Sequence, residues 1–200
     1  MTRLIPIRLI DCCKKALLVL VLLAAFVYAA TPSVSDDFTE RRITAGTKIF
    51  RAMLAADVDI EHKTDSNGEL RLCLLYINDT GNAEKAAQTF NIRDDLRIRK
   101  IKTRIEVMSL AECIADQKGR LAGVFLTQRL DARQLQTLTT IANRQHTVVF
   151  SPFEGDVEQG VQGGIAVEAR VRPYLNTNAL RAARVRLKSF FMKVAKAYEE

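Results

Sequence analysis

The sequence predicts an α/β fold, namely a three-layer, Rossmann-like sandwich with a mainly parallel sheet. Apolar runs that suit buried strands lie at residues 70–77, 121–126 and 146–150, and an imperfectly alternating run predicts a further strand at residues 102–108. Helical stretches with an apolar stripe or a capping signal separate these runs. Polar turns rich in Asn, Asp, Gly and Ser follow several of the strands. Strands that alternate with helices in this way are typical of parallel sheets with right-handed crossovers.

The N-terminus has the three parts of a secretory signal peptide. Four basic side chains lie within residues 1–15, an apolar run spans residues 16–30, and Val27-Tyr28-Ala29 offers small residues for cleavage. We therefore expect residues 1–29 to be removed and the mature protein to be periplasmic, without stable insertion in the membrane. The alternative is that the apolar run is retained as an anchor, although it is short for a spanning helix.

The charge of the mature chain argues against nucleic acid as a partner. Residues 1–29 hold four basic and one acidic side chain, so their removal lowers the formal net charge from +7 to +4. Much of the basicity therefore belongs to the targeting segment, and export separates the protein from nucleic acid. The remaining mild excess of basic residues suits an acidic protein patch or anionic lipid headgroups.

The mature chain is expected to form a single domain over residues 38–198, and its first element is a helix over residues 38–56. The apolar stripe of this helix consists of Ile43, Ile49, Phe50, Met53 and Leu54. A polar connection, residues 57–68, ends at the Asn67-Gly68 turn.

The middle of the chain is expected to alternate strands with helices. The first strand, residues 70–77, is apolar almost throughout, as in a central strand buried on both faces. Ser109 and Glu112 form a capping box at the start of a short helix. The elements that follow the first strand are expected to be a helix at 83–90, a strand at 102–108, a helix at 109–116, a strand at 121–126, a helix at 131–144, a strand at 146–150 and a loop at 151–162.

The C-terminal third predicts one strand followed by one docking helix. A strand is expected over residues 165–172 and is closed by Pro173. No helix separates it from the preceding strand, so we expect it to run antiparallel at an edge of the sheet. Residues 176–178 offer an N-cap, and an apolar stripe at helical spacing then runs from Leu180 to Tyr198.

Cys73 and Cys113 are a candidate disulfide. Cys12 and Cys13 leave with the targeting segment, so these two thiols remain in an exported chain. The alternative is a pair of buried free thiols, since Cys is among the most buried residue types.

No set of residues with catalytic or metal-binding spacing stands out. The sequence has no Gly-rich phosphate loop and no G-x-S-x-G elbow, and neither His62 nor His146 lies in a metal-ligand motif. We therefore expect no enzymatic activity, no metal and no cofactor. Polar residues 78–81, 127–128 and 151–152 follow strands, where parallel α/β sheets bind ligands.

The chain resembles the YfiR-like family over about residues 38–195. The resemblance is greatest in the last third, where a Gly163-Gly164 pair, a small apolar strand, an Arg-Val-Arg run and an Ala-rich basic helix follow one another. LRLCLLYIND resembles the first strand of the family, and AECIADQKGRLAGVFLTQ a later segment. The chain departs from the family pattern at residues 57–63, which lack an aromatic Trp-Pro, and at Tyr174, which takes an acidic position.

The resemblance implies a periplasmic regulator that is not an enzyme. Such a protein binds the periplasmic part of an inner-membrane diguanylate cyclase and keeps the cyclase inactive, which lowers cyclic di-GMP. It also implies that Cys73 and Cys113 form a structural or redox-sensitive pair.

The partner-contacting residues that we expect are Ile49, Phe50, Met53, Arg172 and Tyr174, with burial in the core as the alternative for most of the first three. Self-association as a homodimer is a further option that the sequence leaves open.

The second hypothesis is a periplasmic protein that binds a small ligand in the crevice at the carboxyl ends of the strands. An exposed apolar patch would favour the regulator, whereas a concave pocket with converging polar groups would favour the ligand-binding protein.

Overall fold

The computed structural model describes residues 34–90, 96–116 and 119–199. The predicted signal peptide, residues 1–29, lies outside this part of the chain. Residues 1–38 and 39–200 are two separate units. The fold described below belongs to the second, and the first contributes only the beginning of helix α2 (Val34–Ala56). Within the described residues, no helix has both the length and the apolar character needed to cross a membrane.

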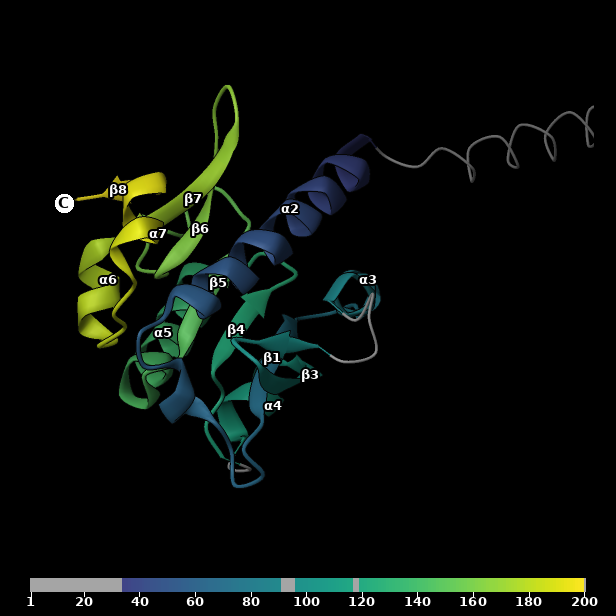
Figure 1. Ribbon diagram of the computed structural model, residues 1–200. Helices are drawn as coiled ribbons and strands as arrows, with labels where there is room; N and C mark the ends of the chain where they lie inside the picture. Colours follow the sequence, from purple (N-terminus) through teal and green to yellow (C-terminus); the bar gives the residue numbers. More distant parts are fainter. Residues whose placement is uncertain (1–33, 91–95, 117–118, 200) are drawn as a thin grey trace, which may run out of the picture. The chain divides into compact units, whose positions relative to one another are not determined.

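Eight strands form a single, mostly parallel sheet with the order β2-β3-β1-β4-β5-β6-β7-β8 (Figure 1). The α/β fold that the sequence predicts is therefore confirmed. Strands β3, β1, β4, β5 and β6 run parallel to one another, whereas β2 is antiparallel to β3 and β7 is antiparallel to β6. The strands are β1 (Leu70–Tyr76), β2 (Arg97–Ile98), β3 (Ile101–Ser109), β4 (Gly123–Leu126), β5 (Val148–Ser151), β6 (Gly163–Val167), β7 (Val171–Asn176) and β8 (Lys196–Tyr198).

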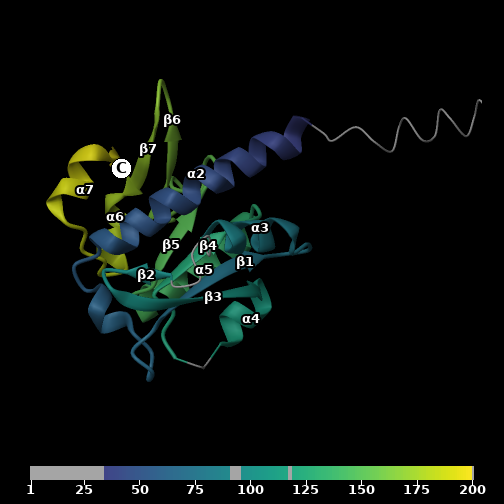
Figure 2. The same cartoon turned by 45° about the vertical axis from the view of Figure 1, so that its right-hand side comes forward.

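Helices cover both faces of this sheet and complete the predicted three layers. One core contains side chains from α2 and α3 (Gly81–Phe90), and the other contains side chains from α4 (Leu110–Ala115) and α5 (Ala132–Gln145). Figure 2 shows α2 and α4 on opposite sides of the sheet. The predicted capping box is present, because Ser109 pairs with Glu112, and a second one, which was not predicted, joins Asp131 to Gln134.

Strand β1 lies in the interior of the sheet, third in the strand order, and its nearly all-apolar sequence suits this position. It pairs with β3 on one side and with β4 on the other. Its side chains alternate between the two cores, with Leu72 and Leu74 on one face and Cys73 and Leu75 on the other. A strand buried on both faces needs apolar residues at every position, and β1 meets this requirement except at Arg71.

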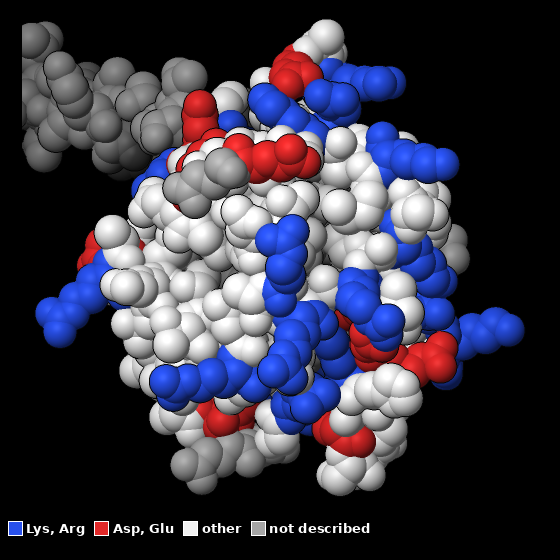
Figure 3. Space-filling model, turned by 90° about the vertical axis from the view of Figure 1, so that its left-hand side faces the viewer, with Lys and Arg blue, Asp and Glu red and all other residues white. Residues whose placement is uncertain are grey.

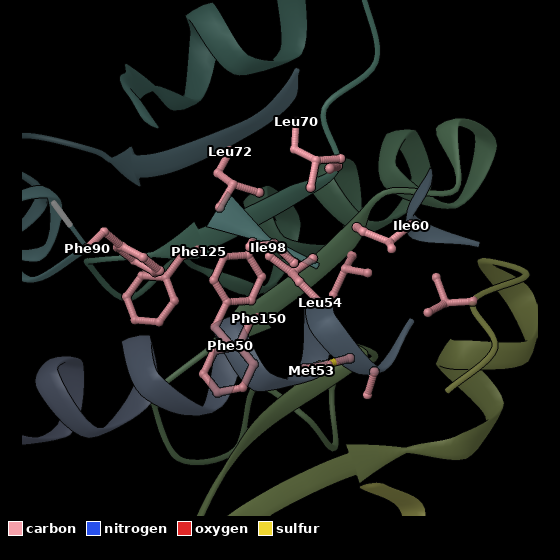
Figure 4. Packing of buried hydrophobic residues seen from close by; sticks show 14 of the residues in the cluster. Phe50, Met53, Leu54, Ile60, Leu70, Leu72, Phe90, Ile98, Phe125 and Phe150 are labelled. Atoms are coloured by element: carbon pink, nitrogen blue, oxygen red, sulfur yellow. The ribbon is translucent and has the colours of Figure 1, made fainter. Parts of the chain in front are cut away.

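Phe50 of α2 lies at the middle of the larger core (Figure 4). Its ring centroid is 5.6 Å from those of Phe125 and Phe150, and 6.2 Å from that of Phe90. A β-carbon on Gly123 would lie 2.6 Å from this ring, so only glycine lets α2 approach β4 this closely. Burial of one such aromatic side chain stabilises the fold by about 2–3 kcal/mol.

The prediction of one strand over residues 165–172 is wrong, because the segment forms a hairpin. Strand β6 runs parallel to β5, and β7 returns antiparallel to β6 with Val167 opposite Val171. Pro173 lies inside β7 rather than at a strand end. It is tolerated there because β8 pairs with β7 only from Tyr174 onward, so Pro173 has a strand neighbour on one side only.

The single helix predicted from Leu180 to Tyr198 is also wrong in its extent. The segment consists of α6 (Thr177–Ala182), an extended turn, α7 (Ser189–Val194) and then β8. Asn176 caps α6 as expected, by accepting a hydrogen bond from the Ala179 amide. Arg184 then takes a left-handed conformation, with φ of 54°, and ends the helical path. The backbone beyond it bonds to other elements, since the Lys188 amide donates to the Ala56 carbonyl at 2.9 Å.

Candidate functional site

The carboxyl ends of β1 and β4 meet where the strand order reverses, which is the usual ligand site of such folds. In this chain Gln128 fills the position. Its Oε1 accepts hydrogen bonds from the Ile77 and Asn78 amides at 2.7 and 3.0 Å, and its Nε2 donates to the Asp79 carbonyl at 3.0 Å. The Gly81 amide at the start of α3 donates to Asp79. The amides of Ile77, Asn78 and Gly81 therefore already have protein partners.

A second place at the same edge of the sheet is hollow. The β5–β6 crevice, as we name it, has a volume of about 170 Å³ and lies at the carboxyl ends of β5 and β6. It lies between α2, the loop after β5, the β6–β7 hairpin and the start of β8. Its lining consists of Arg42, Phe153, Glu154, Gly155, Val157, Glu158, Ile165, Ala166, Val167, Glu168, Tyr174 and Lys196.

Tyr174 is the central polar group of the crevice. Its hydroxyl donates a hydrogen bond to Glu158 at 3.0 Å, and the ammonium of Lys196 lies 5.4 Å from the centre of its ring. Burial, followed by the hydrogen bond to Glu158, raises the pKa of Tyr174 to about 12. The phenol therefore remains protonated, and a donor, at any physiological pH.

Glu168 is the anionic centre of the same crevice. It pairs with Lys196 at 3.2 Å and with Arg172 at 2.9 Å, and these two cations, Lys196 foremost, lower the pKa of Glu168. The buried Nε of Arg172 has no hydrogen-bond partner within the described residues. The structure thus brings the predicted residues Arg172 and Tyr174 to one site, where Tyr174 lines the crevice and Arg172 contacts Glu168 at its rim.

Sequence reasoning missed Glu158, Glu168, Lys196 and Arg42 as members of this site. Lys196 reaches it because β8 pairs with β7 in a register that sets Tyr174 opposite Lys196. No sequence motif signals this pairing, since β8 has only three residues and was predicted as part of a helix.

The prediction that Phe50 and Met53 contact a partner is wrong. Both side chains are fully buried, and only Ile49, which is partly buried against the core, reaches the surface. Met53 packs so tightly on Gly163 that a β-carbon there would lie 2.6 Å from its sulfur. The apolar stripe of α2 is therefore the inner face of the helix, as its periodicity allows.

Exposed apolar side chains are found at the other end of the chain. Val167 and Val171, which pair at the end of the β6–β7 hairpin, are 54% and 46% exposed. Phe190 and Val194 on α7 are 59% and 57% exposed and lie one helical turn apart. Within the described residues, the other large apolar side chains with comparable exposure are Phe38, Val58 and Ile114.

Cys73 and Cys113 are neighbours, although they are not bonded to each other. Both are buried free thiols, Cys73 on β1 and Cys113 on α4, and they share the smaller core. The hydrogen bond between the two thiols, together with burial, raises the pKa of Cys73 well above its usual value. The structure therefore brings the predicted pair together but shows the free-thiol alternative rather than the disulfide.

A wide depression of about 1030 Å³ borders β3 and α4. Its polar lining groups are engaged within the protein. Glu106 accepts from Arg71 and Arg104, Asp116 pairs with Arg71, and Glu112 caps the Ser109 amide. This arrangement leaves few free polar groups for a ligand. Within the described residues, no three His, Cys, Asp or Glu side chains gather as metal ligands do.

Comparison with known proteins shows the fold and no family. No family model matches the chain, and no curated protein matches it. A crystal structure of a conserved domain protein from Vibrio cholerae O1 biovar El Tor aligns with a TM-score of 0.53 at 11% identity, covering 78% of this chain and 60% of that one. This likeness shows the fold alone.

The ABC domain from Streptococcus pneumonia, solved in complex with L-Trp, aligns with a TM-score of 0.47 at 7% identity and covers 72% of this chain. In both comparisons, the chain spans about 60% of the other protein's length.

Proposed function

We propose that this protein is a periplasmic, non-enzymatic regulator that binds the periplasmic part of an inner-membrane diguanylate cyclase and represses it. The observation that carries the proposal is the end of the β6–β7 hairpin, where Val167 and Val171 expose paired apolar side chains. Exposed apolar pairs beside charged groups are typical of protein interfaces. Glu168 and Arg172, which flank these valines, supply the polar rim. The resemblance to the YfiR-like family supplies the identity of the partner.

Repression requires no chemistry at this surface. A binder that contacts the inactive conformation of the cyclase more tightly than the active one shifts the population toward the inactive state. Release of the regulator then raises cyclic di-GMP and favours biofilm growth. A thousandfold difference in affinity corresponds to about 4 kcal/mol, which a few well-packed side chains can supply.

The test is co-purification from membranes with a matched pair of variants. Wild-type protein should recover a membrane protein with a diguanylate cyclase domain, and V167D/V171D should lose it. The control variant Val58→Asp changes a residue that is 42% exposed on another segment, and it should still recover the cyclase. Equal recovery by all three proteins, or recovery of no cyclase by the wild type, would refute the proposal. The same experiment under oxidising and reducing conditions tests whether a bond between Cys73 and Cys113 controls binding.

A second candidate function is capture of a small ligand in the β5–β6 crevice, where Tyr174, Glu158 and Lys196 converge. Ligand pockets are usually about 300–1,000 Å³, and this crevice is smaller, so we rank this candidate second. Native mass spectrometry of the purified protein checks it. A retained small molecule that Tyr174→Phe releases and Tyr198→Phe keeps would favour ligand binding. An unliganded mass in all three proteins would exclude it.

A further inference from the structure

The charged side chains of one long segment near the C-terminus are all positive. Residues 169–198 contain eight Lys or Arg and no Asp or Glu. The net charge of residues 30–200 is +4, so everything outside this segment sums to −4. A single-sign surface of this kind attracts a partner of opposite charge over several ångströms.

Some of these cations have acidic partners and some do not. Arg172 and Lys196 pair with Glu168, and Arg186 pairs with Asp59 at 2.7 Å. Within the described residues, no ion pair engages the other five, which are Arg170, Arg181, Arg184, Lys188 and Lys193. Arg181 lies on α6, Lys193 lies on α7, and Arg184 and Lys188 lie between the two helices. Figure 3 shows Lys and Arg side chains gathered on the side of the molecule that carries these helices.

Apolar side chains stand among these cations. On α7, Phe190 and Val194 occupy successive turns of one helix face, and Lys193 lies beside them. Phe191, on the inner side, is buried, so α7 is held to the core while its outer face is free. We name the group Arg181, Arg184, Lys188, Phe190, Lys193 and Val194 the basic C-terminal face.

We propose that the basic C-terminal face binds the surface of a membrane rich in anionic phospholipid. Helices that bind anionic membranes expose apolar side chains flanked by Lys and Arg. The apolar side chains insert among the lipid headgroups, and the cations contact the phosphates. A lipid surface requires no matching shape, whereas a stable protein interface needs about 800 Å² on each side. The contact is peripheral and reversible, and it is independent of the cyclase proposal.

The absence of tryptophan from the sequence makes a clean test available. In the full chain, Phe190→Trp places one indole on the basic C-terminal face, and Ile114→Trp places one on α4, where Ile114 is 37% exposed. Phosphatidylglycerol vesicles should shift the emission of the first variant to the blue and leave that of the second unchanged. Phosphatidylcholine vesicles, or 0.5 M salt, should abolish the shift. The N-terminal segment is the same in both proteins and cannot produce the difference.

Charge variants made in the Phe190→Trp background identify the side chains responsible. Each cation near an anionic membrane contributes a factor of roughly five to the partition coefficient. Lys193→Glu should therefore weaken binding at least fivefold, whereas Arg133→Glu, at an exposed position on α5, should change it less than about twofold.

Four results would overturn the inference: no shift in the Phe190→Trp variant, an equal shift with neutral vesicles, equal losses from the two charge variants, or a shift with polyglutamate but not with vesicles. The last result would assign the face to an acidic protein partner. A thermal melt of each variant confirms that it is folded.

Discussion

Arg71 is a fully buried arginine on the interior strand β1, and its surroundings explain how the fold tolerates it. Its guanidinium donates to both carboxylate oxygens of Glu106 at 2.9 and 2.8 Å and to the Gly119 carbonyl at 2.9 Å, and it pairs with Asp116 at 2.8 Å. The hydrogen bond from Arg71 lowers the pKa of Glu106. A buried charge held by this many partners is costly to disturb, because removing one ion leaves the others without compensation.

We expect Arg71→Met to lower the free energy of unfolding by about 3–5 kcal/mol. Arg104→Met is the matched control, since Arg104 also contacts Glu106 but is 45% exposed, and it should cost no more than about 1 kcal/mol. Urea denaturation at pH 7 measures both. Equal losses would show that burial of the ion pair adds nothing to its contribution.

Asp156, in the loop after β5, makes the stability of the fold depend on pH. Burial raises the pKa of Asp156, although the hydrogen bond from the Ser151 hydroxyl and the charge of Arg129 act in the opposite sense. A carboxyl whose pKa is higher in the folded state stabilises the fold at low pH, and this stability is lost as the pH rises through the folded-state pKa.

Asp156→Asn should therefore gain stability relative to wild type as the pH rises from 3 toward 7. Thermal melts of both proteins across this range measure the difference. A constant difference in melting temperature would show that Asp156 does not titrate differently in the folded and unfolded states. Glu158, which also faces Asp156, is kept unchanged in both proteins.

At the scale of elements, the break between α6 and α7 has a specific backbone cause. Arg184 adopts a left-handed conformation at the end of α6, and the Val185 amide bonds back to the Leu180 carbonyl at 2.9 Å. Glycine is the residue that this position favours.

Arg184→Gly should raise the free energy of unfolding by roughly 0.5–1 kcal/mol, because it removes the strain of a side chain at positive φ. His146 is the control. It has the same conformation at the end of α5, with φ of 58°, but its Nδ1 lies 3.1 Å from the Ala183 carbonyl. His146→Gly should bring no gain, because it also loses this contact. Denaturant unfolding decides between the two, and equal gains would mean that the histidine contact contributes nothing.

At the scale of the whole molecule, the alternation of strands and helices was predictable and the ends of the sheet were not. The buried run at β1 and the capping boxes at Ser109 and Asp131 are local signals, so they can be recognised from the sequence. Strands β2 and β8 have two and three residues, and they exist only because a neighbouring strand pairs with them. Tertiary pairing of this kind overrides the helical spacing of residues 180–198.

The residues of the candidate site were likewise predictable only in part. Arg172 and Tyr174 were predicted through a family resemblance, and Cys73 and Cys113 because they are the only cysteines beyond the predicted signal peptide. Their neighbours Glu158 and Lys196 come from segments far away in the sequence, and a strand register that no motif encodes brings them to Tyr174. Phe50 and Met53 were named as partner contacts with burial in the core as the alternative, because an apolar stripe on a helix does not by itself tell an inner face from an outer one.

Gln128 has a consequence for how this fold could change over evolutionary time. Its amide group accepts from two backbone amides and donates to a backbone carbonyl, so the chain carries its own tethered occupant where related architectures hold a diffusible molecule. Replacing Gln128 by a residue with a shorter side chain would leave the amides of Ile77 and Asn78 and the carbonyl of Asp79 without this hydrogen-bond partner, so that a small ligand could bind them instead. At this point of the chain, a single side chain therefore separates a filled strand-end position from one that is open to a small ligand.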